Sequence, residues 1–215
     1  MTRTWFTADL HFGDLGGRDF TSAEEMAEVM IDNHNAKVKS TDVVWMLGDV
    51  AVGQIRDTLP LLKRLKGRKY LVAGEQDRCF AGAQPDKGLR ARWVSAYREQ
   101  GGFIGVVTGA GRLAAPKSPT PLLLPRVGGE LAGVRVQLSH FPYARGKNDP
   151  ADRFAAVRPK PWRPKPGEPY PWLLHGHVGD EWCIDGDMIN VSADAWGLDP
   201  VDDEVIHALI EGGPQ

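Results

Sequence analysis

The sequence predicts an α/β fold in one domain that spans residues 1–215. In the first half, short runs rich in β-forming residues alternate with segments of helical periodicity. In the second half, several β-type runs follow one another closely. A chain of 215 residues is long enough to enclose one continuous core. The composition, with 42% hydrophobic and 25% charged residues and a net charge of −2, is typical of soluble globular proteins and shows no overall bias toward nucleic acid or membranes.

Three strands are predicted in the first half, at residues 4–8, 42–47 and 69–73. A helix is predicted from Thr21 onward, because Ser22 and Glu25 form a capping box and Met26 and Met30 recur at helical spacing. A second helix is expected over residues 55–65. This β-α-β-α-β order predicts parallel neighbouring strands with functional residues beyond their carboxyl ends.

The second half is predicted to begin with a helix over residues 89–99. Three β-type runs then start at residues 103, 121 and 134, separated by turn residues with no room for long helices, which favours a more antiparallel sheet. Two further strands are expected at residues 171–177 and from residue 188. A closing helix within residues 202–212 is predicted to stop at Gly212.

The segment 143–171 differs from the rest of the chain. It contains seven prolines and seven lysines or arginines, but only three acidic residues. Because proline removes a backbone donor and blocks helices, we expect an extended surface loop. This loop is either a solvated connector or a basic lid beside a phosphate site.

The two cysteines and the N-terminus bear on the location of the protein. Cys79 and Cys183 could pair, but reduced thiols in a cytosolic protein are the simpler interpretation. The N-terminus has no long apolar export segment, and no stretch is long enough to span a bilayer. We therefore expect a cytoplasmic protein.

Polar clusters follow several of the predicted strands. They are Asp9 and His11 after the first strand, Asp49 after the second, residues 74–77 after the third, and His140 and His177 in the second half. A single aspartate at a strand end often caps a helix, and a single histidine is often structural, but a whole set at neighbouring strand ends favours a site. Imidazole with carboxylate ligands suits manganese, iron or zinc. A shared carboxylate can bridge two such ions about 3.5 to 4 Å apart, an arrangement that activates water for phosphoryl displacement.

The ordered motifs also resemble a known family. TWFTADLHFG, VVWMLGDVA, GRKYLVAGEQDR, VQLSHFPY, LLHGHV and INVSADAW follow the order D-x-H, G-D, G-N-H-D, H and G-H-x-H. This order resembles the calcineurin-like metallophosphoesterases, in particular their compact bacterial and phage members, over nearly the whole chain. The resemblance implies a four-layer sandwich of two mixed β-sheets flanked by helices, with a dinuclear site in the groove where the strand ends meet.

Carried over by position, the resemblance implies a metal-ligand set of Asp9, His11, Asp49, Glu75, His140 and His177. Asp9 and His11 would bind the first metal, Asp49 would bridge, and His140 and His177 would bind the second. Glu75 stands where the family has an asparagine ligand. The family's usual proton-donating histidine is replaced by Gln76, and the last histidine of G-H-x-H by Gly179.

These three departures have different chemical consequences. Glu75 keeps an oxygen donor and adds negative charge, so it can hold a metal ion. Gln76 can donate a hydrogen bond to phosphate but cannot supply a proton, a role worth about 10²- to 10⁴-fold. Gly179 leaves a coordination position to be filled by water, Asp180 or His175. Gln76 and Asp77 are the candidate catalytic residues and Arg78 the candidate substrate contact, although a surface salt bridge is an equal interpretation of Arg78.

We expect a metal-dependent phosphoesterase, most specifically a phosphodiesterase for small or cyclic nucleotide-type phosphodiesters. The cofactors expected are divalent ions, manganese with iron, zinc or nickel as alternatives, in a dinuclear or mononuclear site. The expected partner is a small phosphorylated substrate of nucleotide type, with no membrane and no stable nucleic-acid complex. The alternative is a catalytically degenerate homologue that binds nucleotide or phosphate, which the changes at Gln76 and Gly179 motivate. His34 and His207 are expected at the surface or in packing. The core is expected to contain Trp5, Trp45, Trp172, Trp182 and Trp196.

Overall fold

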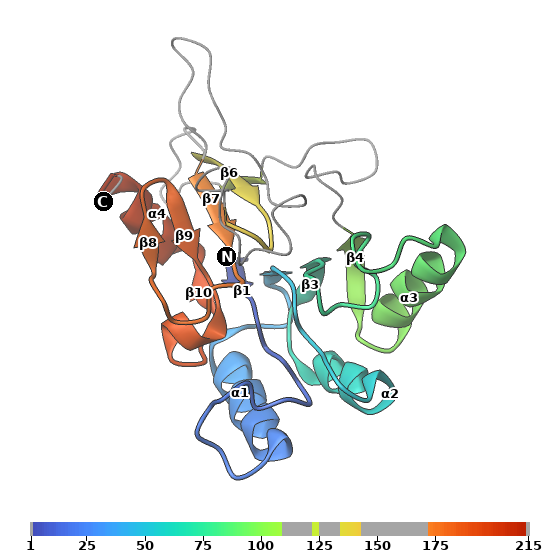
Figure 1. Ribbon diagram of the computed structural model, residues 1–215. Helices are drawn as coiled ribbons and strands as arrows, with labels where there is room; N and C mark the ends of the chain where they lie inside the picture. Colours follow the sequence, from blue (N-terminus) through green and yellow to red (C-terminus); the bar gives the residue numbers. More distant parts are fainter. Residues whose placement is uncertain (1, 109–121, 125–133, 143–171, 214–215) are drawn as a thin grey trace.

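The computed structural model describes residues 2–108, 122–124, 134–142 and 172–213. Within these residues the chain forms two five-stranded sheets, in the orders β10-β1-β2-β3-β4 and β5-β6-β7-β9-β8. The two sheets and the helices beside the first of them can be followed in Figure 1. The predicted α/β class is therefore observed, with two mixed sheets. The basic segment 143–171 lies outside the described residues.

The first sheet confirms the predicted parallel order of the first half. Strands β1 (Thr4–Thr7), β2 (Val43–Met46) and β3 (Arg68–Val72) pair in parallel, with helix α1 (Ala23–Lys37) between the first two. Ser22 caps α1, because its side chain accepts a hydrogen bond from the Glu25 N–H at 3.1 Å. The short β10 (Val201–Asp202) pairs antiparallel with β1 and forms the edge strand on that side of the sheet.

The run that starts at Phe103 does not belong to an antiparallel sheet, and that prediction was wrong. It forms β4 (Phe103–Val107), which pairs in parallel with β3 in the first sheet. The reason is helix α3 (Lys87–Glu99), which comes between the two strands in the sequence and provides the crossover connection that a parallel pair requires.

The second sheet is mixed rather than mainly antiparallel. Only its two edges are antiparallel, β5 (Leu122–Leu124) with β6 (Val134–Leu138) and β8 (Ile184–Asp185) with β9 (Met188–Asn190). Strand β7 (Trp172–His175) is parallel to both β6 and β9. This arrangement brings the carboxyl ends of β6 and β7 to one edge, where His140 and His177 follow them.

The second predicted helix is shorter and changes type along its length. An α-helix, α2, covers only Ile55–Thr58 and continues as a 3-10 helix over Leu59–Arg64. Pro60 lies at the start of the 3-10 segment and has no N–H to donate to a carbonyl four residues earlier. The α-helical hydrogen-bond ladder predicted over residues 55–65 is therefore interrupted.

The apolar core is divided by the first sheet. One cluster joins this sheet to helices α1 and α3, with Phe12, Met30 and Tyr97 among its members. A second cluster fills the space between the two sheets and includes Trp45 and Trp172, as predicted for these two residues, with Trp196 only partly buried against it. Helix α4 (Asp203–Glu211) contributes Ile206 to this second cluster and ends near Gly212. A small cluster of Leu173 and Met188 lies on the outer face of the second sheet, and no helix in the described part of the chain contributes to it. The described residues therefore form three of the four expected layers.

Both thiols are free, with Cys79 buried and Cys183 exposed. Of the helices in the described ranges, none combines the length and the apolar character needed to cross a bilayer.

His34 on α1 is a packing residue with a consequence for stability. It is 4% exposed, and its Nε2 lies 2.9 Å from the carbonyl oxygen of Lys66. Burial lowers the pKa of His34 to about 4. Because the unfolded state binds a proton below about pH 6.5 that the folded state does not bind, stability falls as the pH decreases from about 6.5 toward 4.

We expect this effect to disappear in His34→Gln, whose amide can still donate to the Lys66 carbonyl. Between pH 7.5 and 5, the free energy of unfolding of the wild type should fall by about 2 kcal/mol more than that of H34Q. Urea denaturation at the two pH values measures the difference. Equal pH slopes for the two proteins would contradict the assignment.

Candidate metal centre

Four of the predicted site residues have left-handed backbone at the strand ends. Asp9 and His11 follow β1, and Asp49 follows β2, with positive φ angles of 56°, 51° and 52°, and His177 after β7 has a φ of 76°. Among the described non-glycine residues only Leu198 shares this conformation. A left-handed backbone conformation is energetically unfavourable for aspartate and histidine. It occurs most often at functional sites, where the surrounding structure stabilises it.

Backbone hydrogen bonds join these loops into one surface. The Asp9 N–H donates to the Gly48 carbonyl and the His11 N–H to the Asp49 carbonyl, both at 3.0 Å. Gly48 has a φ of 91°, and a Cβ there would lie 2.6 Å from the Gly74 nitrogen and 2.5 Å from His140 Nδ1. The close approach of the three loops therefore requires glycine at this position.

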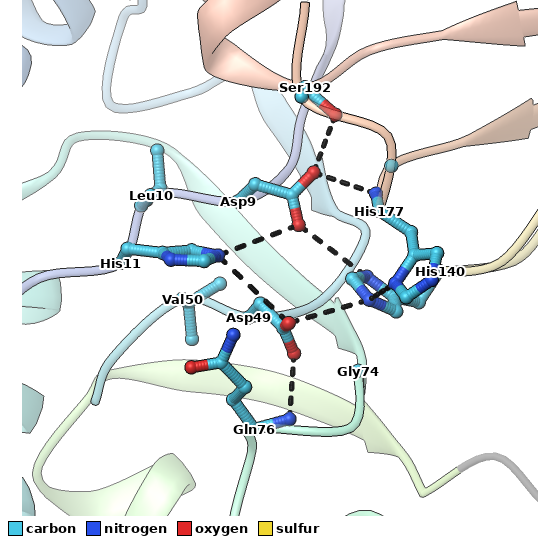
Figure 2. Close-up of polar contacts among 12 residues, drawn as sticks. Asp9, Leu10, His11, Asp49, Val50, Gly74, Gln76, His140, His177 and Ser192 are labelled. Carbon is cyan, nitrogen blue, oxygen red and sulfur yellow. Dashed lines mark hydrogen bonds and ion pairs between the residues drawn. The ribbon is translucent and has the colours of Figure 1, made fainter. Parts of the chain in front are cut away.

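The first group of candidate ligands is Asp9, His11 and Asp49. His11 Nε2 lies 3.9 Å from Asp9 Oδ1 and 4.0 Å from Asp49 Oδ2. These distances exceed hydrogen-bond length but do not exceed twice a metal–ligand bond of roughly 2.0–2.2 Å. Figure 2 shows the three side chains converging on one point, which is the geometry expected around an ion.

The second group is Glu75, His140 and His177. Glu75 Oε2 lies 2.6 Å from His140 Nε2, and Glu75 Oε1 lies 3.0 Å from His177 Nδ1. His140 is 1% exposed, and its Nδ1 faces the Leu47 carbonyl at 2.8 Å, which leaves Nε2 directed at the site. Asp49 Oδ2 lies 3.5 Å from His140 Nε2, so Asp49 faces both groups.

The charges of the site favour a bound cation. Burial raises the pKa of Asp49 to about 7, and the carboxylates of Asp77, Glu75 and Asp9 add to this effect. Burial alone would lower the pKa of His140, but the carboxylates of Asp49, Glu75 and Asp9 raise it to about 10. The carboxylates thus attract positive charge strongly, and a metal ion that binds here releases protons.

The residues present fit one or two divalent ions. Each group supplies imidazole nitrogen and carboxylate oxygen, the donors preferred by manganese, iron and zinc. Within the described residues no thiol contributes to either group.

The remaining residues that the sequence singled out, Gln76, Asp77, Arg78 and Gly179, differ in their burial and in their hydrogen-bond partners. Gln76 is exposed at the open side of the site, and its backbone N–H donates to Asp49 Oδ1 at 2.9 Å. Asp77 is fully buried beneath the loops and accepts hydrogen bonds from backbone N–H groups. Arg78 is exposed, and no ion pair of its side chain is seen among the described residues. Gly179 has a φ of 58°, and its carbonyl accepts from Asn190 Nδ2 at 2.8 Å.

Two residues at the site are not singled out by the sequence pattern. The Ser192 hydroxyl donates to Asp9 Oδ2 at 2.5 Å, and Arg18 donates to the Asp9 carbonyl at 2.6 Å. Ser192 follows β9 in the same way that the predicted residues follow their strands, which is the one signal that could have found it. Arg18 lies in a polar turn before α1 and carries no such signal.

The gene 66 protein of Mycobacterium phage D29 is 30% identical to this chain over 229 residues, which cover 99% of this chain and 100% of the phage protein. The chain belongs to the family of these phage gene 66 proteins. The gene 66 protein of Mycobacterium phage L5 is 28% identical over 228 residues and is likewise covered almost completely, at 99% of each chain. No family model matches this gene 66 family member.

Solved structures show that the fold of this gene 66 family member is shared with an Aquifex aeolicus protein of unknown function. The match has a TM-score of 0.59 and 21% identity, and it covers 97% of this chain and 100% of that chain. Similarity to the phosphopantetheinyl hydrolase of Mycobacterium tuberculosis is weak, with a TM-score of 0.33 over 70% of this chain and 48% of that chain.

Proposed function

We propose that this protein is a metal-dependent phosphoesterase, and more specifically a phosphodiesterase for small or cyclic nucleotide-type phosphodiesters. The observation that supports this most strongly is the position of Asp49, a member of the first ligand group that also faces the second. Its Oδ2 lies 4.0 Å from His11 Nε2 and 3.5 Å from His140 Nε2. Divalent ions held there, which we expect to be manganese, would supply water activation and charge stabilisation at phosphorus.

The exposure of the side chains indicates where the substrate approaches. Asp9, Asp49 and His140 are buried, whereas the His11 and His177 side chains are 20% and 19% exposed and Gln76 is exposed. A phosphoryl group would therefore enter from the side of Gln76. The Gln76 amide can donate a hydrogen bond to a phosphoryl oxygen but cannot protonate a leaving alkoxide, which favours substrates with good leaving groups.

The charge of the ligand set weakens the electrostatic preference for monoesters over diesters. Asp9, Asp49 and Glu75 bring three negative charges, so two divalent ions would leave the centre with only one net positive charge. A phosphodiester carries about one negative charge and a monoester about two near neutral pH. The centre therefore gains little from the second charge of a monoester, and a singly charged diester can compete as its substrate.

Glu75 tests this preference directly. We expect Glu75→Gln, which keeps an oxygen donor but removes the charge, to shift the ratio of kcat/KM for monoester over diester upward by about tenfold or more, because unit charges about 5 Å apart interact by about 3 kcal/mol at an effective dielectric constant near 20. Bis-p-nitrophenyl phosphate and p-nitrophenyl phosphate at saturating manganese provide the measurement. Glu75→Asp keeps the charge and should leave the ratio near that of the wild type. An unchanged ratio in E75Q would remove the electrostatic basis for accepting diesters.

A phosphate- or nucleotide-binding protein without turnover is the second candidate function. Gly179 and Gln76 favour it, since the resemblance places a ligand and a proton donor at these two positions. This candidate predicts one metal ion or none per chain and no hydrolysis. A large gain of activity in the double variant Gly179→His with Gln76→His, from a negligible starting level, would identify the native protein as a degenerate enzyme.

Gly179→His should raise manganese affinity on its own by about tenfold or more. A Cβ at Gly179 meets nothing within 4 Å, so the imidazole has room to turn toward the first group. The left-handed backbone costs about 1–2 kcal/mol. Gly186→His is a matched control, because Gly186 has a φ of 59° and is equally open but lies in the turn between β8 and β9. Isothermal titration with manganese measures both variants, and equal affinities would show that position 179 does not reach the metal.

A further inference from the structure

Three alternate residues, Asn190 at the end of β9 and Ser192 and Asp194 beyond it, make hydrogen bonds around the site. Asn190 and Ser192 are fully buried, and the Asp194 side chain is 25% exposed. None of the three belongs to either ligand group, yet each makes a hydrogen bond to a segment of the site. Together with Arg18, the residues Asn190, Ser192 and Asp194 form what we call the positioning strip.

Ser192 determines which oxygen of Asp9 is free. Its hydroxyl donates to Asp9 Oδ2 at 2.5 Å, and the His177 N–H donates to the same oxygen at 2.8 Å. Oδ2 is thereby occupied by two donors, while Oδ1 faces His11 Nε2 at 3.9 Å. Figure 2 shows Ser192 and the His177 nitrogen on one side of this carboxylate and His11 on the other. Asp9 is therefore held for binding through a single oxygen.

Asp194 acts on the same loop through Arg18. The Arg18 guanidinium pairs with both oxygens of Asp194 at 2.6 and 2.7 Å. It also donates to the backbone carbonyls of Asp9 at 2.6 Å and Leu10 at 3.1 Å. These carbonyls belong to the turn that carries Asp9 and His11, both in left-handed backbone. The bidentate pair is well suited to hold a strained turn.

Asn190 holds the loop that carries Gly179. Its Nδ2 donates to the carbonyls of Gly179 at 2.8 Å and Trp182 at 2.7 Å, and its Oδ1 accepts from the Ser192 N–H at 3.0 Å. The same strip thus connects the turn of Asp9 with the loop of Gly179.

We propose that the positioning strip, Arg18, Asn190, Ser192 and Asp194, preorganises Asp9 and His11 as metal ligands. The inference rests on the proposed metal site but concerns residues that touch no metal. With few protein ligands on the first ion, affinity depends on how little those ligands must rearrange, and partners that orient a ligand are commonly worth 10- to 100-fold in metal affinity.

Manganese affinity of Ser192→Ala and Asp194→Asn, measured by isothermal titration, tests the proposal, with the visible absorption of the cobalt-substituted protein as a second readout. We expect a 10- to 100-fold loss of affinity and an altered cobalt spectrum in both variants, with thermal unfolding of the metal-free proteins still cooperative. Asp199→Asn is the matched control, since it breaks the Lys37–Asp199 ion pair of 2.7 Å nearby without contacting the site, and it should bind like the wild type.

A purely structural role would lower the unfolding temperature while leaving affinity and spectrum unchanged, and this result would overturn the proposal. The outcome is separable from failure of the metal site itself. If the wild type binds manganese and the two variants bind it equally well, only the positioning strip is refuted. If the wild type binds no metal, both proposals are refuted.

Discussion

Asp49→Ala is expected to lower turnover of bis-p-nitrophenyl phosphate by about 10³-fold or more while leaving the protein folded. Asp49 is 2% exposed and faces His11 in the first group and His140 in the second. Its removal therefore weakens both metal positions, and with them the activation of water and the stabilisation of charge at phosphorus.

The folded state should survive this change. Burial raises the pKa of Asp49 to about 7, which means that the ionised carboxylate is disfavoured in the protein alone. The cost of the variant is mainly the hydrogen bond from the Gln76 N–H, about 1 kcal/mol. Asp49→Asn, which keeps the shape but not the charge, should lose activity similarly. A D49A protein that retains its metal and its turnover would disprove the shared role of Asp49.

Asp77→Ala should instead destabilise the fold, by about 3–5 kcal/mol in urea denaturation of the metal-free protein. Asp77 is fully buried and accepts hydrogen bonds from the N–H groups of Gly74 and Asp49, both at 2.9 Å, and of Val50 at 3.3 Å. The Tyr97 hydroxyl also donates to it, at 3.1 Å. Truncation would leave these donors buried without a partner.

The same variant distinguishes a positioning role from the catalytic role that the sequence pattern suggests for Asp77. Asp57→Ala, at an exposed position on α2, serves as the control and should change stability by less than about 0.5 kcal/mol. If D77A is as stable as the wild type and loses only turnover, Asp77 acts in the chemistry. If stability falls as expected, Asp77 works by tying the Asp49 loop to the loop of Glu75.

Much of the site could be predicted because parallel strands impose a simple rule. The carboxyl ends of β1, β2 and β3 meet at one edge, so polar residues directly after each run are brought together regardless of their separation in the chain. Asp9, Asp49 and Glu75 were predictable for this reason. No single residue predicted a site. The prediction came from the order of the motifs along the chain.

Other features depend on interactions that a linear pattern does not contain. The parallel placement of β4 follows from α3 acting as a crossover, which requires reading strand and helix together. The end of α2 follows from one missing donor at Pro60. The contact of Arg18 with the Asp9 carbonyl arises only when η2 (Ala193–Trp196) supplies Asp194 to hold the guanidinium.

Metal-dependent hydrolysis of bis-p-nitrophenyl phosphate by purified protein tests the central claim most directly. The protein is treated with chelator, reloaded with manganese, checked for metal content, and assayed beside D49A prepared in the same way. We predict about two manganese ions per chain, turnover that depends on the metal, and background rates for D49A. A folded, fully loaded wild type that hydrolyses neither this diester nor a 2',3'-cyclic nucleotide faster than D49A would contradict the account.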